Sequence, residues 1–164
     1  MKEKIYNMLP NSFQNILISI FNMLAYKKRY GGNYKNYLAL FKQHRNLSLI
    51  DLKTIQQKEF NKLVSYTINN SPFYTKLYSN IHNATDLNNI QALPIVNKEM
   101  FRQDISQVYT VGKKVGMVSK TGGTTGKSLE VLFTPDNMQE RFAMLDDFRS
   151  RFGYQLGKRT AWFS

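Results

Sequence analysis

The sequence has no cysteine among its 164 residues, which excludes disulfides, thiolate metal ligands and a cysteine nucleophile. Acidic residues are also scarce, because 11 Asp and Glu stand against 23 Lys and Arg, and the formal net charge is +12. Such a balance favours anionic partners: nucleic acid, anionic lipid or phosphorylated small molecules. The lysines are scattered along the chain, however, so a basic surface that only keeps the protein soluble is the simpler interpretation.

Long hydrophobic runs are missing too. A spanning helix needs about 18 apolar residues in a row, and residues 16–24 are interrupted by Ser19 and Asn22. The run is followed by Tyr-Lys-Lys-Arg instead of the small residues of a signal-peptide cleavage site. We therefore expect a non-secreted, cytoplasmic protein, which agrees with the absence of cysteine.

The first third of the chain has the apolar spacing of an amphipathic helix. Ser12 is expected to cap this helix, Gly31 and Gly32 to end it, and the basic residues 27–29 suit the negative end of its dipole. It either packs on its own domain, the usual role of such a helix, or lies on an anionic membrane surface. The residues that share the apolar face are Phe13, Ile16, Leu17, Ile20, Phe21 and Leu24.

Further helices are expected over residues 34–41 and 54–68, where apolar residues again recur at helical spacing. Ser71 followed by Pro72 is typical of a new helix start. Residues 81–92 are polar and resemble a loop. Asn97 is expected to cap a helix that runs through Ile105. The aromatic residues of this region are expected to pack in the core, not to stack on nucleic-acid bases.

The last third changes to strand patterns. Residues 108–115 are strand-like but interrupted by Gly112, and residues 129–134 alternate with a period of two. Pro135 is expected to begin a helix with one apolar face, and Arg159 a further strand. The fold class is therefore α/β: a helical N-terminal part that leads into a β-hairpin and a helix. The apolar face would hold Met138, Phe142, Leu145 and Phe152.

Between the two strand patterns lies a segment rich in glycine and hydroxyl groups, flanked by Lys120. Glycine backbone N–H groups and threonine hydroxyls can surround a phosphate, and a lysine adds a point charge. We expect the phosphates of a nucleotide to be bound by Thr121, Gly122, Gly123, Thr124, Thr125, Gly126 and Lys127, with the charge supplied by Lys120 or Lys127. An ordinary glycine-rich hairpin turn is the alternative.

A Walker A loop fits this segment less well. Residues 121–128 match G-x-x-x-x-G-K-[ST] at Gly126, Lys127 and Ser128, but Thr121 replaces the first glycine. A Walker loop also opens a helix, whereas the residues that follow here alternate as a strand.

The segment resembles the phosphate-binding motif of the adenylate-forming enzymes, written [ST]-[SG]-G-[ST]-[ST]-G-x-P. Two upstream segments resemble the phenylacetate–CoA ligase branch and its CapK-like relatives, which are linked to capsular polysaccharide biosynthesis. These segments are N-S-P-F-Y-T-K-L-Y at 70–78 and L-P-I-V-N-K at 93–98. The resemblance covers residues 55–164. Ser128 departs from it by replacing the proline of the motif.

The resemblance implies an ATP-dependent, AMP-forming carboxylate–CoA ligase with ATP, Mg²⁺ and CoA as cofactors or co-substrates. It also implies two parts: a helical segment over 1–54 and the truncated start of an AMP-binding domain over 55–164. The family's adenylate, ribose and C-terminal lysine motifs do not occur in this sequence. We therefore expect an N-terminal fragment that is inactive alone, and no catalytic residue or carboxylate substrate is assigned.

Two alternatives stay open. The chain could be a basic module that binds an anionic surface or nucleic acid, although no specific nucleic-acid partner is expected. It could also be a non-catalytic protein completed by a second chain.

Overall fold

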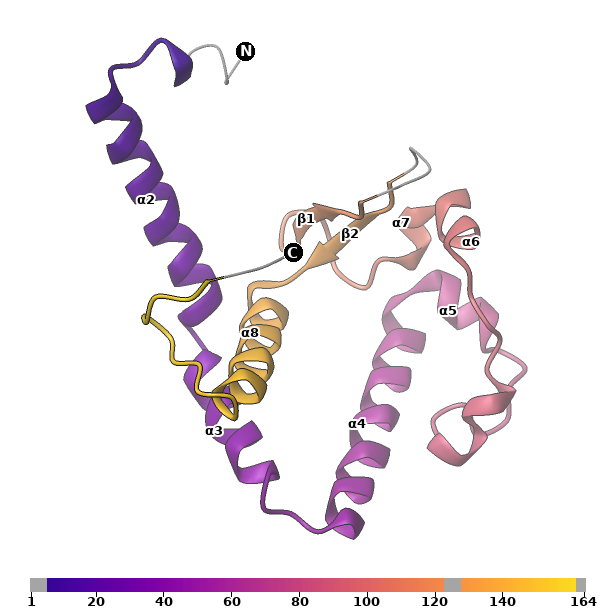
Figure 1. Ribbon diagram of the computed structural model, residues 1–164. Helices are drawn as coiled ribbons and strands as arrows, with labels where there is room; N and C mark the ends of the chain where they lie inside the picture. Colours follow the sequence, from indigo (N-terminus) through magenta and orange to yellow (C-terminus); the bar gives the residue numbers. More distant parts are fainter. Residues whose placement is uncertain (1–5, 123–127, 162–164) are drawn as a thin grey trace. The chain divides into compact units, whose positions relative to one another are not determined.

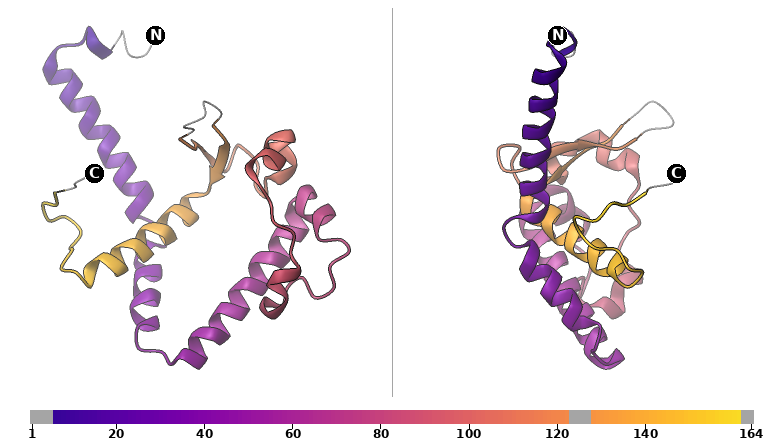
Figure 2. Two further views of the ribbon diagram at one scale, coloured as in Figure 1. Left: turned by 45° about the vertical axis from the view of Figure 1, so that its right-hand side comes forward. Right: turned by 60° about the vertical axis from the view of Figure 1, so that its left-hand side comes forward.

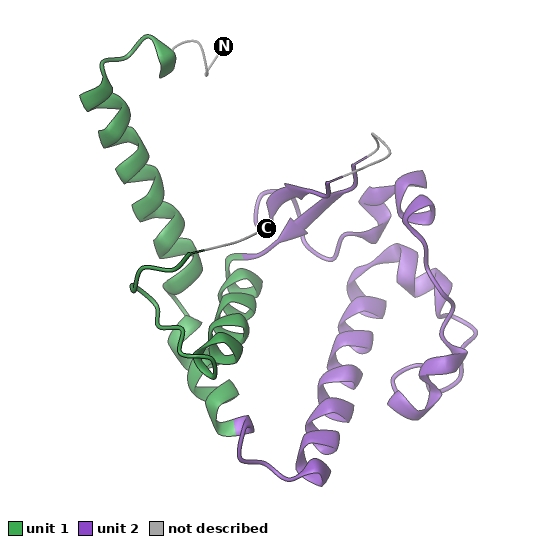
Figure 3. Ribbon diagram, in the orientation of Figure 1, with its two compact units in different colours: residues 1–43, 135–164 green, residues 44–134 purple. Residues whose placement is uncertain are grey.

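The computed structural model describes residues 6–122 and 128–161 (Figure 1). The chain divides into two compact units: unit 1 combines residues 1–43 and 135–164, and unit 2 spans residues 44–134 (Figure 3). The described part is mostly helical with a two-stranded antiparallel sheet followed by a helix, which confirms the mixed α/β class. The proposed boundary at residue 54 stays a prediction.

Unit 1 contains the helices α2 (Asn11–Tyr30), α3 (Tyr34–His44) and α8 (Pro135–Ser150). The start of α2 differs from the prediction, because Pro10 and not Ser12 is the capping position and no side chain caps the helix. The Pro10 carbonyl instead accepts the N–H groups of Phe13 and Gln14 at 2.9 and 3.1 Å. The end of the helix is confirmed: Gly31 is its C-cap.

The turn between α2 and α3 is held on α8 by one amide side chain. Gln139 is 8% exposed. Its Oε1 accepts the Asn33 N–H at 2.9 Å, and its Nε2 donates to the Lys28 carbonyl at 3.3 Å. Gly32 has φ +49, and a Cβ there would lie 2.5 Å from the Gln139 Oε1. Glycine therefore serves both the positive φ and the close approach of the amide.

Tyrosine hydroxyls of α3 add further bonds to α8. Tyr34 donates to the Asp146 Oδ2 at 2.9 Å, with both residues buried, and Tyr37 donates to the Asp136 Oδ2 at 2.7 Å. Of the apolar residues predicted to share one face of α8, Met138, Phe142 and Leu145 are half-buried, and Phe152, beyond the end of the helix, is 77% exposed. The helix buries Gln139, Ala143, Asp146 and Asp147, and of these Asp146 is bonded by Tyr34 of α3 and Gln139 by Asn33 of the α2–α3 turn.

Unit 2 begins with α4 (Leu49–Asn70), which starts earlier than predicted because the Ser48 hydroxyl accepts the Asp51 N–H at 3.1 Å. The predicted start at Ser71 is confirmed: it caps α5 (Pro72–Leu77). Ser71 is 1% exposed and its hydroxyl also donates to the Gln107 carbonyl at 3.0 Å. One small side chain thus both caps a helix and joins two distant segments.

Three short helices follow, η1 (Leu87–Ala92), α6 (Lys98–Gln103) and α7 (Ile105–Val108). The first lies within the predicted loop, where Asp86 caps it. Asn97 caps α6 as predicted, but the helix does not continue through Ile105. Asp104 interrupts it with φ −154 and caps α7 by accepting the Ser106 N–H at 3.1 Å.

The predicted strand at 108–115 is wrong. The Gly112 carbonyl accepts the N–H groups of Val115 and Gly116 at 3.0 and 3.1 Å, which makes a turn. The first strand is β1 (Met117–Lys120), and it pairs with β2 (Glu130–Phe133) as a hairpin. Of the further strand predicted at Arg159, residues 159–161 are not in a strand, and residues 162–164 lie outside the described part.

Replacing Tyr34 by Phe tests the buried bond to Asp146. The substitution keeps the ring and leaves a buried carboxyl oxygen without its donor, so we expect the free energy of unfolding to fall by about 1–3 kcal/mol. Tyr30→Phe is the matched control, because the ring of Tyr30 packs on Phe142 at 5.6 Å between centroids and that contact survives. Urea unfolding of the variants measures both changes, and equal effects would contradict the importance of the buried bond.

The pH dependence of unfolding tests Asp136. Hydrogen bonds from Tyr37 and then Asn33 lower the pKa of Asp136 below its ordinary value of 3.8. The unfolded chain therefore takes up the proton first as the pH falls, and the stabilisation present above the ordinary pKa is lost below it. Between about pH 6 and about pH 3, Asp136→Asn should lose less unfolding free energy than the wild type. An unchanged slope in the variant would refute this role.

Candidate functional site

The glycine-threonine segment is carried by the β1–β2 hairpin of unit 2. The strands pair antiparallel from Met117 opposite Phe133 to Lys120 opposite Glu130. The segment between them is therefore followed by a strand, as predicted, and not by the helix that a Walker loop requires. Of the predicted phosphate-binding residues, Thr121 and Gly122 are described, and residues 123–127 lie outside the described part.

Thr121 closes the hairpin with two hydrogen bonds. Its N–H donates to the Leu129 carbonyl at 2.9 Å, and its Oγ1 accepts the Leu129 N–H, also at 2.9 Å. A threonine hydroxyl has one donor and two acceptor positions, so its proton remains available after this bond. Thr121 can thus fix the entry of the segment and still donate to an anion.

Two lysines near the hairpin, Lys113 and Lys120, differ in whether a carboxylate is bound to them. Lys113 lies 3.0 Å from the Glu130 Oε1, and the hydrogen bond from this carboxylate raises the pKa of Lys113. Tyr109 supports the arrangement, because its hydroxyl donates to the Glu130 carbonyl at 3.3 Å. The carboxylate opposite Lys120 therefore already has a cation. Lys120 is exposed at the end of β1, next to the segment, where a lysine can act as a point charge for an anion.

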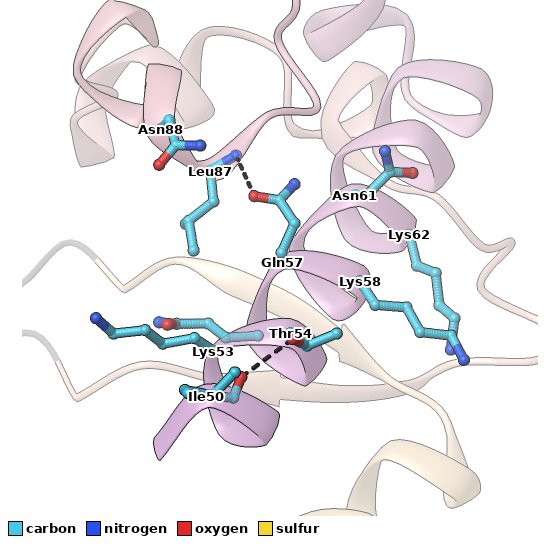
Figure 4. Close-up of a pocket in the computed structure, with 10 residues that line it drawn as sticks. Ile50, Lys53, Thr54, Gln57, Lys58, Asn61, Lys62, Leu87 and Asn88 are labelled. Carbon is cyan, nitrogen blue, oxygen red and sulfur yellow. Dashed lines mark hydrogen bonds between the residues drawn. The ribbon is translucent and has the colours of Figure 1, made fainter. Parts of the chain in front are cut away.

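A second candidate is a groove of about 960 Å³ beside α4, which includes Gln57, Lys58 and Leu87. Gln57 bridges to the start of η1 and to the residue Thr85 before it: its Oε1 accepts the Leu87 N–H at 3.0 Å, and its Nε2 donates to the Thr85 carbonyl at 3.2 Å. Figure 4 shows Lys53 extending to one side and Lys58 and Lys62 to the other. Because the lysines do not converge on one point, the groove offers no focused anion site.

Within residues 6–122 and 128–161 there is no group of His, Asp and Glu side chains that could hold a metal ion. Over the same residues, every helix falls short of the length and apolar character needed to cross a membrane.

Comparison with known proteins gives one line of similarity. No protein-family model matches the chain, and no solved structure matches it. The chain is 30% identical over 158 residues to Protein CapK of Staphylococcus aureus. The aligned region is 94% of this chain but only 34% of the length of that relative. This similarity supports the CapK-like part of the resemblance.

Proposed function

We propose that the segment 121–127 binds the phosphates of ATP in a protein that activates a carboxylate as an acyl-adenylate, with a role in capsular polysaccharide biosynthesis. The observation that carries the proposal is the hairpin: a segment of three glycines and three threonines lies between two paired strands. The similarity to Protein CapK over most of the chain supports the capsule-related part of the proposal.

In the proposed reaction a carboxylate oxygen attacks the α-phosphorus of ATP, the bond to the pyrophosphate oxygen breaks, and acyl-AMP forms. The thiol of CoA would then attack the acyl carbon, and AMP would leave. The share of this hairpin is to hold the β- and γ-phosphates, since fixed N–H and O–H donors stabilise phosphate charge without reorganising. Mg²⁺ would arrive with the nucleotide, because the described residues include no metal-binding group of their own.

The described residues support specific roles at the entry of the segment. Thr121 has its hydroxyl proton free to donate while its oxygen holds Leu129. Lys120 is exposed beside it, and its neighbour Glu130 is paired with Lys113. Lys127 is the other candidate for the phosphate charge. The carboxylate substrate is left open, and no catalytic residue is assigned.

Titration of the purified chain with Mg–ATP tests the proposal. Thr124→Val removes one hydroxyl at constant shape, and the loss of a hydrogen bond to a charged group costs about 1.5–3 kcal/mol, so the Kd should rise about tenfold or more. Lys120→Ala and Lys127→Ala identify the lysine that contacts phosphate by the larger loss of affinity.

Ser119→Ala is the control, because Ser119 is exposed on β1 just outside the segment. It should bind Mg–ATP like the wild type. Binding that is unchanged in Thr124→Val and in both lysine variants would refute phosphate binding by this segment.

A further inference from the structure

Helix α2 presents a long apolar face that stays exposed among the described residues of unit 1. It has no buried residue. Phe21 is 70% exposed and Met23 64%, although both side chains are apolar. At about 1.5 Å per residue the 20-residue helix is about 30 Å long, so the exposed face is extensive. Other exposed members of the face are Phe13, Ile16, Leu17, Ile20 and Leu24.

The helix is attached to unit 1 near its C-terminal end. Phe142 of α8 lies 5.6 Å from the Tyr30 ring and 5.3 Å from the Arg29 guanidinium carbon. The Gln139 amide reaches the Lys28 carbonyl. In the views of Figures 1 and 2, α8 lies beside this end and the N-terminal turns of α2 extend beyond it. The C-terminal end of α2 is therefore packed against α8, and most of the apolar face extends beyond this contact.

The charged residues of α2 are all basic and lie at one end of the helix. The helix contains no acidic residue, and its basic residues lie together in the last turn, at 27–29. The face opposite the apolar residues carries uncharged polar side chains such as Asn15, Ser19 and Asn22, all exposed. An apolar face beside a neutral polar face and a basic end matches the boundary between acyl chains and anionic headgroups.

We propose that α2 lies in the plane of an anionic membrane surface. Its apolar face enters the headgroup–acyl boundary, and Lys27 and Lys28 contact lipid phosphates. The helix is not apolar enough to cross the bilayer, which agrees with an orientation along the surface. A second copy of the chain fits the face less well, because each copy carries a net charge of +12 and pairing brings like charges together. The inference does not depend on the hairpin or on ATP.

Cosedimentation with lipid vesicles tests the proposal on the 164-residue chain. Vesicles of phosphatidylglycerol and phosphatidylcholine should bind the protein, and vesicles of phosphatidylcholine alone should bind it weakly. Added salt should weaken the anionic binding, because it screens the basic residues. Phe21→Glu should lower binding about tenfold or more, since a charge resists burial among acyl chains.

Asn22→Glu is the matched control, because it adds the same charge at the adjacent, exposed position on the polar face. It should keep most of the binding. Lys27→Ala combined with Lys28→Ala should reduce binding to anionic vesicles and leave the weak binding to neutral vesicles unchanged. Circular dichroism and thermal unfolding confirm that each variant is folded like the wild type.

Three outcomes would overturn the proposal. The wild type could fail to bind anionic vesicles, or Phe21→Glu and Asn22→Glu could reduce binding equally. Sedimentation velocity could also show a wild-type dimer that Phe21→Glu converts to a monomer, which would assign the face to a second copy. Mg–ATP titration of Phe21→Glu separates this result from the proposed function, because its nucleotide affinity should stay that of the wild type.

Discussion

The hydrogen bonds of the Gln139 amide join α8 to the α2–α3 turn, and the arrangement of unit 1 depends on them. It receives the chain as it leaves α2 and enters α3, through the Lys28 carbonyl and the Asn33 N–H. Gly32 is needed at this point, because the amide lies where a side chain would begin. The unit is therefore joined by polar bonds, with Asp136 and Asp146 as further acceptors.

This arrangement has a consequence for the helices that it joins. Gln139 and Asp146, two of the buried residues of α8, make polar contacts with the α2–α3 turn and with α3. These contacts hold α2 near its C-terminal end. Most of the apolar face of α2 is thus left outside the unit, in contact with solvent. In unit 2 the hairpin has its own closure, because Thr121 and Leu129 exchange two hydrogen bonds and Lys113 neutralises Glu130. The strand pair can therefore present the glycine-threonine segment without help from a following helix.

Local signals in the sequence predicted part of the fold well. Ser71 before Pro72, Asn97 and Gly31 mark helix ends where the structure has them, because caps act over three or four residues. Two of the errors share a physical cause, which is competition between local hydrogen bonds. Asp104 accepts the Ser106 N–H and interrupts a helix, and Gly112 closes a turn within an expected strand. The candidate site was found from its composition and from the strand that follows it.

The sequence by itself determined that α2 is amphipathic, that a strand follows the glycine-threonine segment, and that anionic partners are favoured. These properties follow from side-chain chemistry and spacing along one element. Only the tertiary structure decided which faces are buried. Polar partners on α3 and at the α2–α3 turn bond Gln139 and Asp146, two of the buried residues of α8, while Phe21 on α2 stays exposed. Burial depends on contacts between segments about one hundred residues apart, which spacing within one helix does not report.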